Sequence, residues 1–181
     1  MLDLEGAWGY YPRKFKGLRP EGFGGRVLMA NTKLIESLNR ALSFELTAVI
    51  QYMQHSFLVT GTEREVYRSY FRDQGAESHD HAKMLGDKIV SLGGVPTVEP
   101  SMIRQSTDLA EMLRQDLEME REALAAYMDA WNACGDAELP TRFLLEGRIA
   151  DEQRHVEELE KLTSERRASV SKEKITLRQI G

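Results

Sequence analysis

One pattern of acidic, aromatic and imidazole side chains occurs twice in this chain at nearly the same spacing. Each copy has a glutamate, a tyrosine seven residues later, and then a second glutamate closely followed by a histidine. The two copies are Glu45, Tyr52, Glu77 and His81, and Glu120, Tyr127, Glu152 and His155. In both copies the glutamates are 32 residues apart (45 to 77 and 120 to 152). A single Glu–His pair arises easily by chance, whereas the doubled pattern indicates two related halves of one fold.

Helical periodicity dominates the sequence between these residues and determines the fold class. From about residue 31 to residue 165, apolar side chains recur at steps of three and four, which is the spacing of one face of an α-helix. The pattern predicts four long helices, near residues 31–60, 62–92, 106–134 and 140–164. No alternating strand pattern is present, so we expect an all-α protein. We also expect Thr62 and Glu65 to form a capping box at the start of the second helix.

The lengths of the connections predict how the four helices are arranged. Only a few residues join the first helix to the second and the third to the fourth, so each pair forms an antiparallel hairpin. Residues 93–105, which include Pro96 and Pro100, reach about 45 Å when extended. A helix of thirty residues is also about 45 Å long. The connector can therefore traverse the whole bundle as one long crossover between two helical hairpins.

Length and composition predict one domain without a membrane span. The 181 residues are 41% hydrophobic and 29% charged, and no run of eighteen apolar residues occurs. The N-terminus lacks the basic and apolar segments of a secretory signal, so we expect a cytoplasmic protein. The single cysteine excludes an internal disulfide and a cysteine-based metal site within one chain. A net charge of −5 argues against nucleic acid as the main partner.

Two flanks lie outside the predicted bundle of residues 31–165. Residues 1–30 are rich in glycine, aromatic and basic residues. They predict an N-terminal extension that covers its own bundle, packs on a neighbouring subunit or contacts nucleic acid. Residues 166–181 have no strong pattern and predict a tail or a short fifth helix.

The doubled pattern has the chemistry of a two-metal centre. Four-helix bundles hold two iron or manganese ions with one glutamate from each of two helices and a Glu/His pair from each of the other two. Iron and manganese bind well to carboxylate and imidazole ligands. Buried glutamates in turn need cations to offset their charge. Tyr52 and Tyr127 lie two turns beyond Glu45 and Glu120. They are expected either to hydrogen-bond a ligating carboxylate or to serve as core tyrosines.

Across roughly residues 31–163 the chain resembles the ferritin-like superfamily, and most closely its bacterioferritins. The segments that carry the resemblance are 38–48, Gln51-Tyr52, His81-Ala82, 92–96, 112–117 and 151–155. The resemblance implies that two irons are bound and that Fe(II) is oxidised with dioxygen or peroxide. It also implies assembly into a hollow shell of 12 or 24 subunits. The ligands that it implies are Glu45, His81, Glu120, Glu152 and His155.

Two positions depart from the bacterioferritin pattern. The family has Glu-x-x-His in the first half, but Ser78 stands three residues before His81. The repeat favours Glu77 as the replacement ligand, binding the same metal as His81, and Asp80 and His79 are weaker candidates. The second departure is His79, which stands where bacterioferritins have a haem-ligating methionine. We expect an exposed histidine there, although haem ligation by this residue stays open.

Pattern and resemblance together predict a di-iron ferroxidase that oxidises Fe(II) for iron storage or detoxification. Glu45 and Glu120 are expected to be essential to catalysis as ligands. The expected partners are Fe(II), dioxygen or peroxide, and further copies of the chain in a multi-subunit shell. The alternatives are a rubrerythrin-type peroxidase, a manganese catalase or another two-metal redox enzyme on the same bundle. A DNA-protecting shell that uses the basic N-terminal arm is a further alternative.

Overall fold

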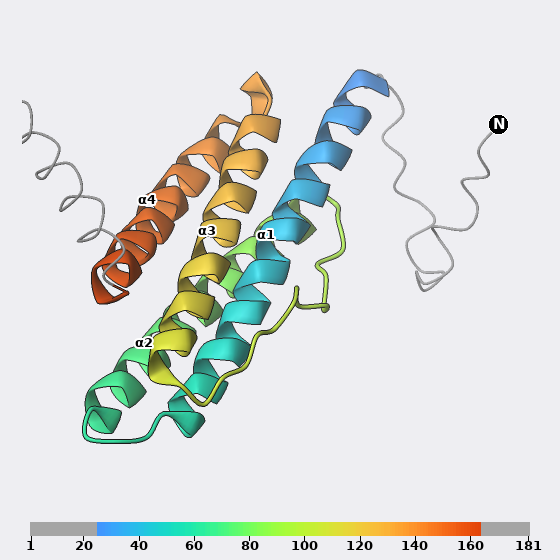
Figure 1. Cartoon of the computed structure of the whole chain (residues 1–181). Coiled ribbons are helices and arrows are strands. Elements are labelled where there is room, and N and C mark those ends of the chain that lie inside the picture. Colours follow the sequence, from blue (N-terminus) through green and yellow to red (C-terminus); the bar gives the residue numbers. More distant parts are fainter. Residues whose placement is uncertain (1–24, 164–181) are drawn as a thin grey trace, which may run out of the picture.

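A computed structural model describes residues 25–163 and shows four long helices, with no strand among those residues (Figure 1). The all-α four-helix prediction is therefore confirmed. The N-terminal arm up to residue 24 and the C-terminal tail lie outside the described residues. The elements are α1 (Gly25–Leu58), α2 (Arg64–Ser91), α3 (Leu109–Ala133), the short 3₁₀ turn η3 (Asp136–Glu138) and α4 (Leu139–Leu162). Pro140 occupies the first turn of α4, as expected from its missing amide hydrogen.

The helices form two antiparallel hairpins, α1 with α2 and α3 with α4, as Figure 1 shows. The segment between α2 and α3 runs back along the bundle, so that α2 and α3 point the same way. This is the predicted long crossover, and the order of the elements agrees with the lengths of the connections.

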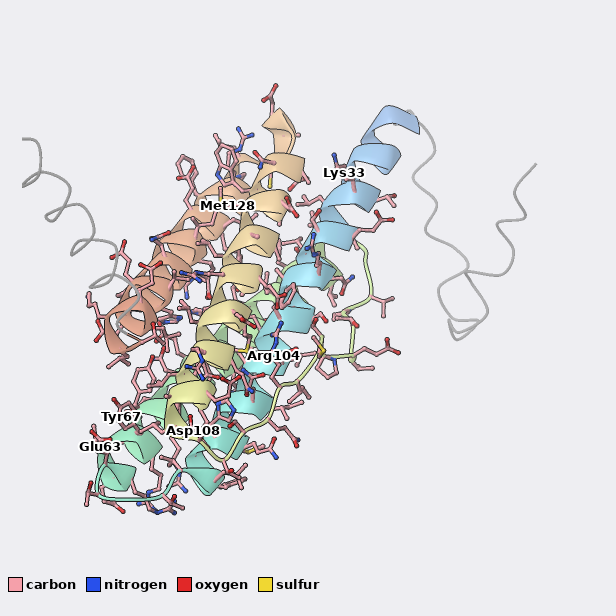
Figure 2. All side chains as sticks on the ribbon, in the orientation of Figure 1. Lys33, Glu63, Tyr67, Arg104, Asp108 and Met128 are labelled. Atoms are coloured by element: carbon pink, nitrogen blue, oxygen red, sulfur yellow. The ribbon has the colours of Figure 1, made fainter. Side chains whose placement is uncertain are left out.

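Polar side chains of α1 hold the crossover in place. Asn39 donates to Val95 O (3.1 Å) and accepts from Thr97 N (2.7 Å). Further along α1, Gln51 Oε1 accepts from Arg104 N at 2.8 Å, and Figure 2 shows Arg104 on this stretch of the crossover. Since an extended segment lacks internal backbone hydrogen bonds, these side chains satisfy groups that would otherwise need water.

The capping box predicted at the start of α2 is wrong. The helix begins at Arg64, and its N-cap residue Glu63 makes no capping hydrogen bond. Gly61 adopts a φ of +89°, and its carbonyl accepts from Arg64 N at 3.2 Å. This left-handed turn satisfies the first free amide, so the helix starts two residues after Thr62 and the Thr-x-x-Glu spacing no longer matches its end.

The interior consists of two apolar clusters with a band of buried polar residues between them. Along α1, Leu42 belongs to one cluster and Ala48 to the other, while buried Glu45 lies between them in sequence. On α3 the buried Glu120 likewise stands between Leu117 and Ala123. The apolar clusters hold the helices together on both sides of the acidic residues and keep water away from them.

Gly94 closes the α2 end against α1, and replacing it with alanine should destabilise the fold. A Cβ there would lie 2.7 Å from Ile35 Cγ2 and 2.9 Å from Ile89 Cγ2, and β-branched side chains have few alternative rotamers. We expect Gly94→Ala to lower the free energy of unfolding by about 1–3 kcal/mol in urea denaturation. The control is Gly86→Ala within α2, where the new Cβ meets nothing within 4 Å. It should stabilise the helix by up to about 1 kcal/mol. Equal stabilities of the two variants would contradict the close approach at Gly94.

Candidate metal centre

Five of the six predicted ligands meet in the polar band at the centre of the bundle. They come from all four helices, and each is at least nine-tenths buried. Their donor atoms form two groups, in each of which all atoms lie within 4.8 Å of one another. Glu152 belongs to both groups. The groups are Glu45, His81 and Glu152, and Glu120, Glu152 and His155.

The two histidines present the same ring nitrogen to these carboxylates. His81 Nδ1 lies 3.2 Å from Glu45 Oε1 and 3.0 Å from Glu152 Oε1. His155 Nδ1 lies 3.8 Å from Glu120 Oε2 and 3.9 Å from Glu152 Oε2. The imidazole rings are nearly parallel, with centroids 6.3 Å apart and an interplanar angle of 15°. The pair therefore forms one wall of the centre, with both Nδ1 atoms turned toward the acidic groups.

The two tyrosines connect the halves of the repeat by crossed hydrogen bonds. Tyr52 on α1 donates to Glu120 Oε1 on α3, and Tyr127 on α3 donates to Glu45 Oε1 on α1, both at 2.5 Å. Burial raises the pKa of both phenols, and the charge of the glutamate that each one contacts raises it further. Both hydroxyls therefore stay protonated and act as donors, which fixes one oxygen of each glutamate.

Burial places the three central carboxylates in an environment that suits cations. Burial raises the pKa of Glu152 well above its usual value, and the charges of Glu120 and Glu45 raise it further. Burial also raises the pKa of Glu45, against the opposing effect of His81. For Glu120, burial raises the pKa, but His155, through a hydrogen bond and its charge, and hydrogen bonds with Glu152 and Tyr52 together outweigh burial and lower the pKa. A shared buried carboxylate that holds its proton in the absence of a cation fits a donor set for two divalent ions.

Metal binding should therefore release protons. Above pH 4.5, the ordinary value for this carboxyl, the raised pKa means that Glu152 holds its proton more tightly in the folded, metal-free protein than in the unfolded chain. The contribution of Glu152 to stability should then fall as the pH rises from 4.5 through the raised pKa, and metal affinity should rise over the same interval. Titration calorimetry with Co(II) in buffers of different ionisation enthalpy should give a heat that depends on the buffer. A heat independent of the buffer would show that Glu152 binds the metal without losing a proton.

The sixth predicted ligand, Glu77, lies on the far side of the histidine pair from both buried groups. Its Oε1 accepts from Arg154 at 2.8 Å, and its Oε2 is 3.2 Å from His155 Nε2. Ser78 is buried, but its hydroxyl donates to Gln74 O in its own helix (3.1 Å). Glu77 also forms, with His81 and Asp151, a third and less buried group whose donor atoms lie within 4.8 Å of one another. Its role as a ligand stays a prediction.

A second buried polar cluster was missed by the sequence analysis. Asp116 is fully buried and accepts from Gln51 Nε2 at 2.9 Å. His55 is also fully buried, and its Nδ1 lies 3.0 Å from Asp116 Oδ1. Asp116 stands one helical turn before Glu120, so the helical period alone could have placed it on the buried face. His79 is exposed, as predicted.

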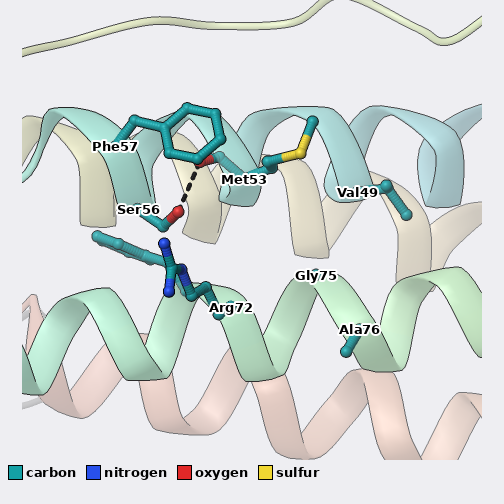
Figure 3. Close-up of a pocket in the computed structure, with 8 residues that line it drawn as sticks. Val49, Met53, Ser56, Phe57, Arg72, Gly75 and Ala76 are labelled. Atoms are coloured by element: carbon teal, nitrogen blue, oxygen red, sulfur yellow. Dashed lines mark hydrogen bonds between the residues drawn. The ribbon is translucent and has the colours of Figure 1, made fainter.

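A surface groove between α1 and α2 lies apart from the carboxylates. Figure 3 shows Met53 and Phe57 of α1 facing Arg72 and Gly75 of α2 across it. The groove encloses about 320 Å³ and is mainly apolar. Met53 and Phe57 are both exposed, and the groove contains no group that could hold a metal.

Comparison with protein families and known proteins assigns the chain to a family. Residues 35–168 match the ferritin-like domain family. Bacterioferritin of Brucella melitensis is 32% identical over 130 residues, which cover 71% of this chain and 81% of the relative. A nutrient stress-induced DNA-binding protein of Synechococcus sp. is 30% identical over 148 residues, covering 75% and 82%. None of the helices in the described part of the chain is long and apolar enough to span a membrane.

Solved structures give the same assignment. A ferritin-like diiron-carboxylate protein from Bacillus anthracis superposes with a TM-score of 0.71 at 33% identity, covering 74% of this chain and 97% of that one. Rhodobacter capsulatus bacterioferritin, solved with a metal-free dinuclear site and haem iron, superposes with a TM-score of 0.67 at 31% identity. The match covers 74% of this chain and 84% of that one. A dodecameric thioferritin from Bacteroides fragilis superposes with a TM-score of 0.67 at 26% identity, covering 81% of this chain and 96% of that one. The chain belongs to the ferritin-like family, close to the bacterioferritins.

Proposed function

We propose that this protein oxidises Fe(II) at a two-metal centre, for iron storage or detoxification. The observation that carries the proposal is the pair of buried donor groups that share Glu152. Two cations held by a common carboxylate lie close enough to act on one oxidant molecule. The diiron-carboxylate and bacterioferritin relatives support this activity at the level of the family.

Each residue of the centre has a defined part in this proposal. Glu45 and His81 would hold one iron, Glu120 and His155 would hold the other, and Glu152 would be shared by both. Bound Fe(II) supplies the electrons that reduce dioxygen or peroxide. The carboxylates offset the cationic charge, and Glu152 gives up its proton on binding. Tyr52 and Tyr127 fix the orientation of Glu120 and Glu45. The apolar clusters exclude bulk water from the centre.

Assembly into a multi-subunit shell forms part of the proposal. The Bacteroides fragilis relative is a dodecamer. Exposed apolar side chains on the described surface, among them Met53 and Phe57 beside the α1–α2 groove, suit contacts between subunits. A DNA-protecting role is the second candidate, because a DNA-binding protein of Synechococcus is among the relatives. Manganese and haem stay open as alternative or additional cofactors.

The proposal is tested by adding Fe(II) to metal-depleted protein and recording oxygen or peroxide consumption. We expect rapid oxidation after binding of two Fe(II) per chain, and a particle of many subunits in native mass spectrometry. Oxidation no faster than in protein-free buffer would exclude a ferroxidase. Peroxide turnover without net iron oxidation would instead favour a peroxidase or a manganese catalase. A stable monomer or dimer would exclude storage in a shell.

A further inference from the structure

The outer edge of the histidine pair carries two buried nitrogen atoms that need a partner. His81 Nε2 and His155 Nε2 are both buried, and neither has a hydrogen-bond partner of good geometry among the described residues. Because both Nδ1 atoms face the central carboxylates, the Nε2 atoms lie on the opposite edges of the rings. A neutral imidazole that binds a metal through Nδ1 carries its proton on Nε2 and must donate it to an acceptor.

Glu77 is placed to be that acceptor for His155. Its Oε2 lies 3.2 Å from His155 Nε2, a distance at which a small rotation of the carboxylate gives a hydrogen bond. Its other oxygen is held by Arg154 at 2.8 Å, so the carboxylate is fixed from the solvent side. Its side chain is 31% exposed, whereas the three central carboxylates are buried. Glu77 thus lies at the edge of the protein interior with the histidine between it and the centre.

The missing ligand at Ser78 gives this placement its significance. Three central glutamates, Glu45, Glu120 and Glu152, supply three negative charges against the four positive charges of two divalent cations. The carboxylate of Glu77 lies behind His155 and is shared with Arg154, so it acts on the centre through the imidazole ring. The carboxylate absent at Ser78 is therefore present one residue earlier, at the outer edge of the histidine.

We propose that Glu77 is a positioning residue that fixes the tautomer and orientation of His155 and does not itself bind the metal. A carboxylate that accepts from Nε2–H leaves Nδ1 unprotonated and directed at the metal, and it raises the basicity of that nitrogen. This differs from the prediction that Glu77 ligates the metal of His81, because the two roles affect opposite halves of the centre. The inference rests on the proposed function only in taking His155 as a metal ligand.

The first test needs no metal. The chain has four histidines, so magic-angle-spinning NMR of ¹⁵N-histidine-labelled, metal-free assembly can report each tautomer at a pH where the rings are neutral. We expect His155 to carry its proton on Nε2 in the wild type and to become a mixture of tautomers in Glu77→Ala. Glu77→Asp should restore part of the preference. Arg154→Gln, which removes the other partner of Glu77, should retain it. An unchanged tautomer in Glu77→Ala would overturn the proposal.

The second test uses Co(II), which binds without being oxidised by air. At saturating cobalt, Glu77→Ala should still hold two ions per chain. At limiting cobalt, anomalous diffraction should show lower occupancy beside His155, with affinity there reduced about 10- to 100-fold, while the ion beside His81 is unaffected. Loss of the ion beside His81 would instead make Glu77 a ligand and overturn the proposal. Wild-type protein that binds no cobalt would refute the proposed ferroxidase, whereas the tautomer result would still decide the role of Glu77.

Discussion

Replacing Glu152 with alanine is expected to abolish rapid Fe(II) oxidation and to weaken both halves of the centre together. Among the described residues, Glu152 alone belongs to both buried donor groups. Its loss removes one oxygen donor from each cation and the only shared charge. Losing a residue that only supports a metal ligand costs up to about 100-fold in activity. Losing Glu152 itself should therefore lower the initial rate of oxidation by at least about 100-fold. Stopped-flow absorbance with anaerobic Fe(II) and added dioxygen measures this rate.

Two further variants make the expectation specific. Glu120→Ala removes a member of one group only, so it should also stop rapid oxidation but retain one Co(II) per chain beside His81. Glu157→Ala changes an exposed glutamate of α4 and should oxidise Fe(II) like the wild type. Circular dichroism should be unchanged in all three, because the apolar clusters that hold the helices are intact. Wild-type oxidation by Glu152→Ala would show that the buried groups are not the site of the reaction.

The sequence predicted those parts of the fold that follow from local periodicity and connection length. Apolar spacing placed all four helices, and the reach of the 93–105 segment gave the crossover. Helix ends were predicted less well, because they depend on single backbone conformations. The left-handed turn at Gly61 moved the start of α2. The start of α3 was expected near Ser106, but the helix is capped by Asp108, whose side chain accepts from Glu111 N at 2.8 Å.

The candidate centre was predictable only in part, because helical spacing identifies a face and not the direction in which a side chain points. Both Glu77 and His81 lie on the face of α2 that is turned toward the centre. The structure places the carboxylate of Glu77 at the Nε2 edge of His155 and beside Arg154 of α4, whereas Nδ1 of His81 faces the central carboxylates. The tyrosine bonds were predictable only in part, since the sequence offered hydrogen bonding to a ligating carboxylate as one alternative but did not indicate that Tyr52 crosses the bundle to Glu120.

Removing the carboxylate of Asp116 should cause a large loss of stability that does not depend on metal. Asp116 and His55 are fully buried, with His55 Nδ1 3.0 Å from Oδ1, and Gln51 donates to the same carboxylate. Burial raises the pKa of Asp116, and the hydrogen bonds and charge of His55 oppose that effect. Asp116→Ala leaves His55 and Gln51 without their partner in the interior. We expect a loss of about 3–5 kcal/mol in the free energy of unfolding of metal-free protein, measured in urea.

The matched control for this loss is Asp129→Ala, on the same helix. Asp129 pairs with Arg40 at 2.9 Å, but both side chains are more than half exposed, so its loss should cost less than about 1 kcal/mol. Equal losses of unfolding free energy in the two variants would show that removing a partner from the buried pair costs no more than removing one from an exposed pair. A double replacement of His55 and Asp116 by leucine should recover part of the stability lost in Asp116→Ala, because the stranded imidazole is then removed and only the Gln51 amide is left without its partner. Such recovery would show that the large effect arises from the stranded partner, and that the pair itself adds little net stability.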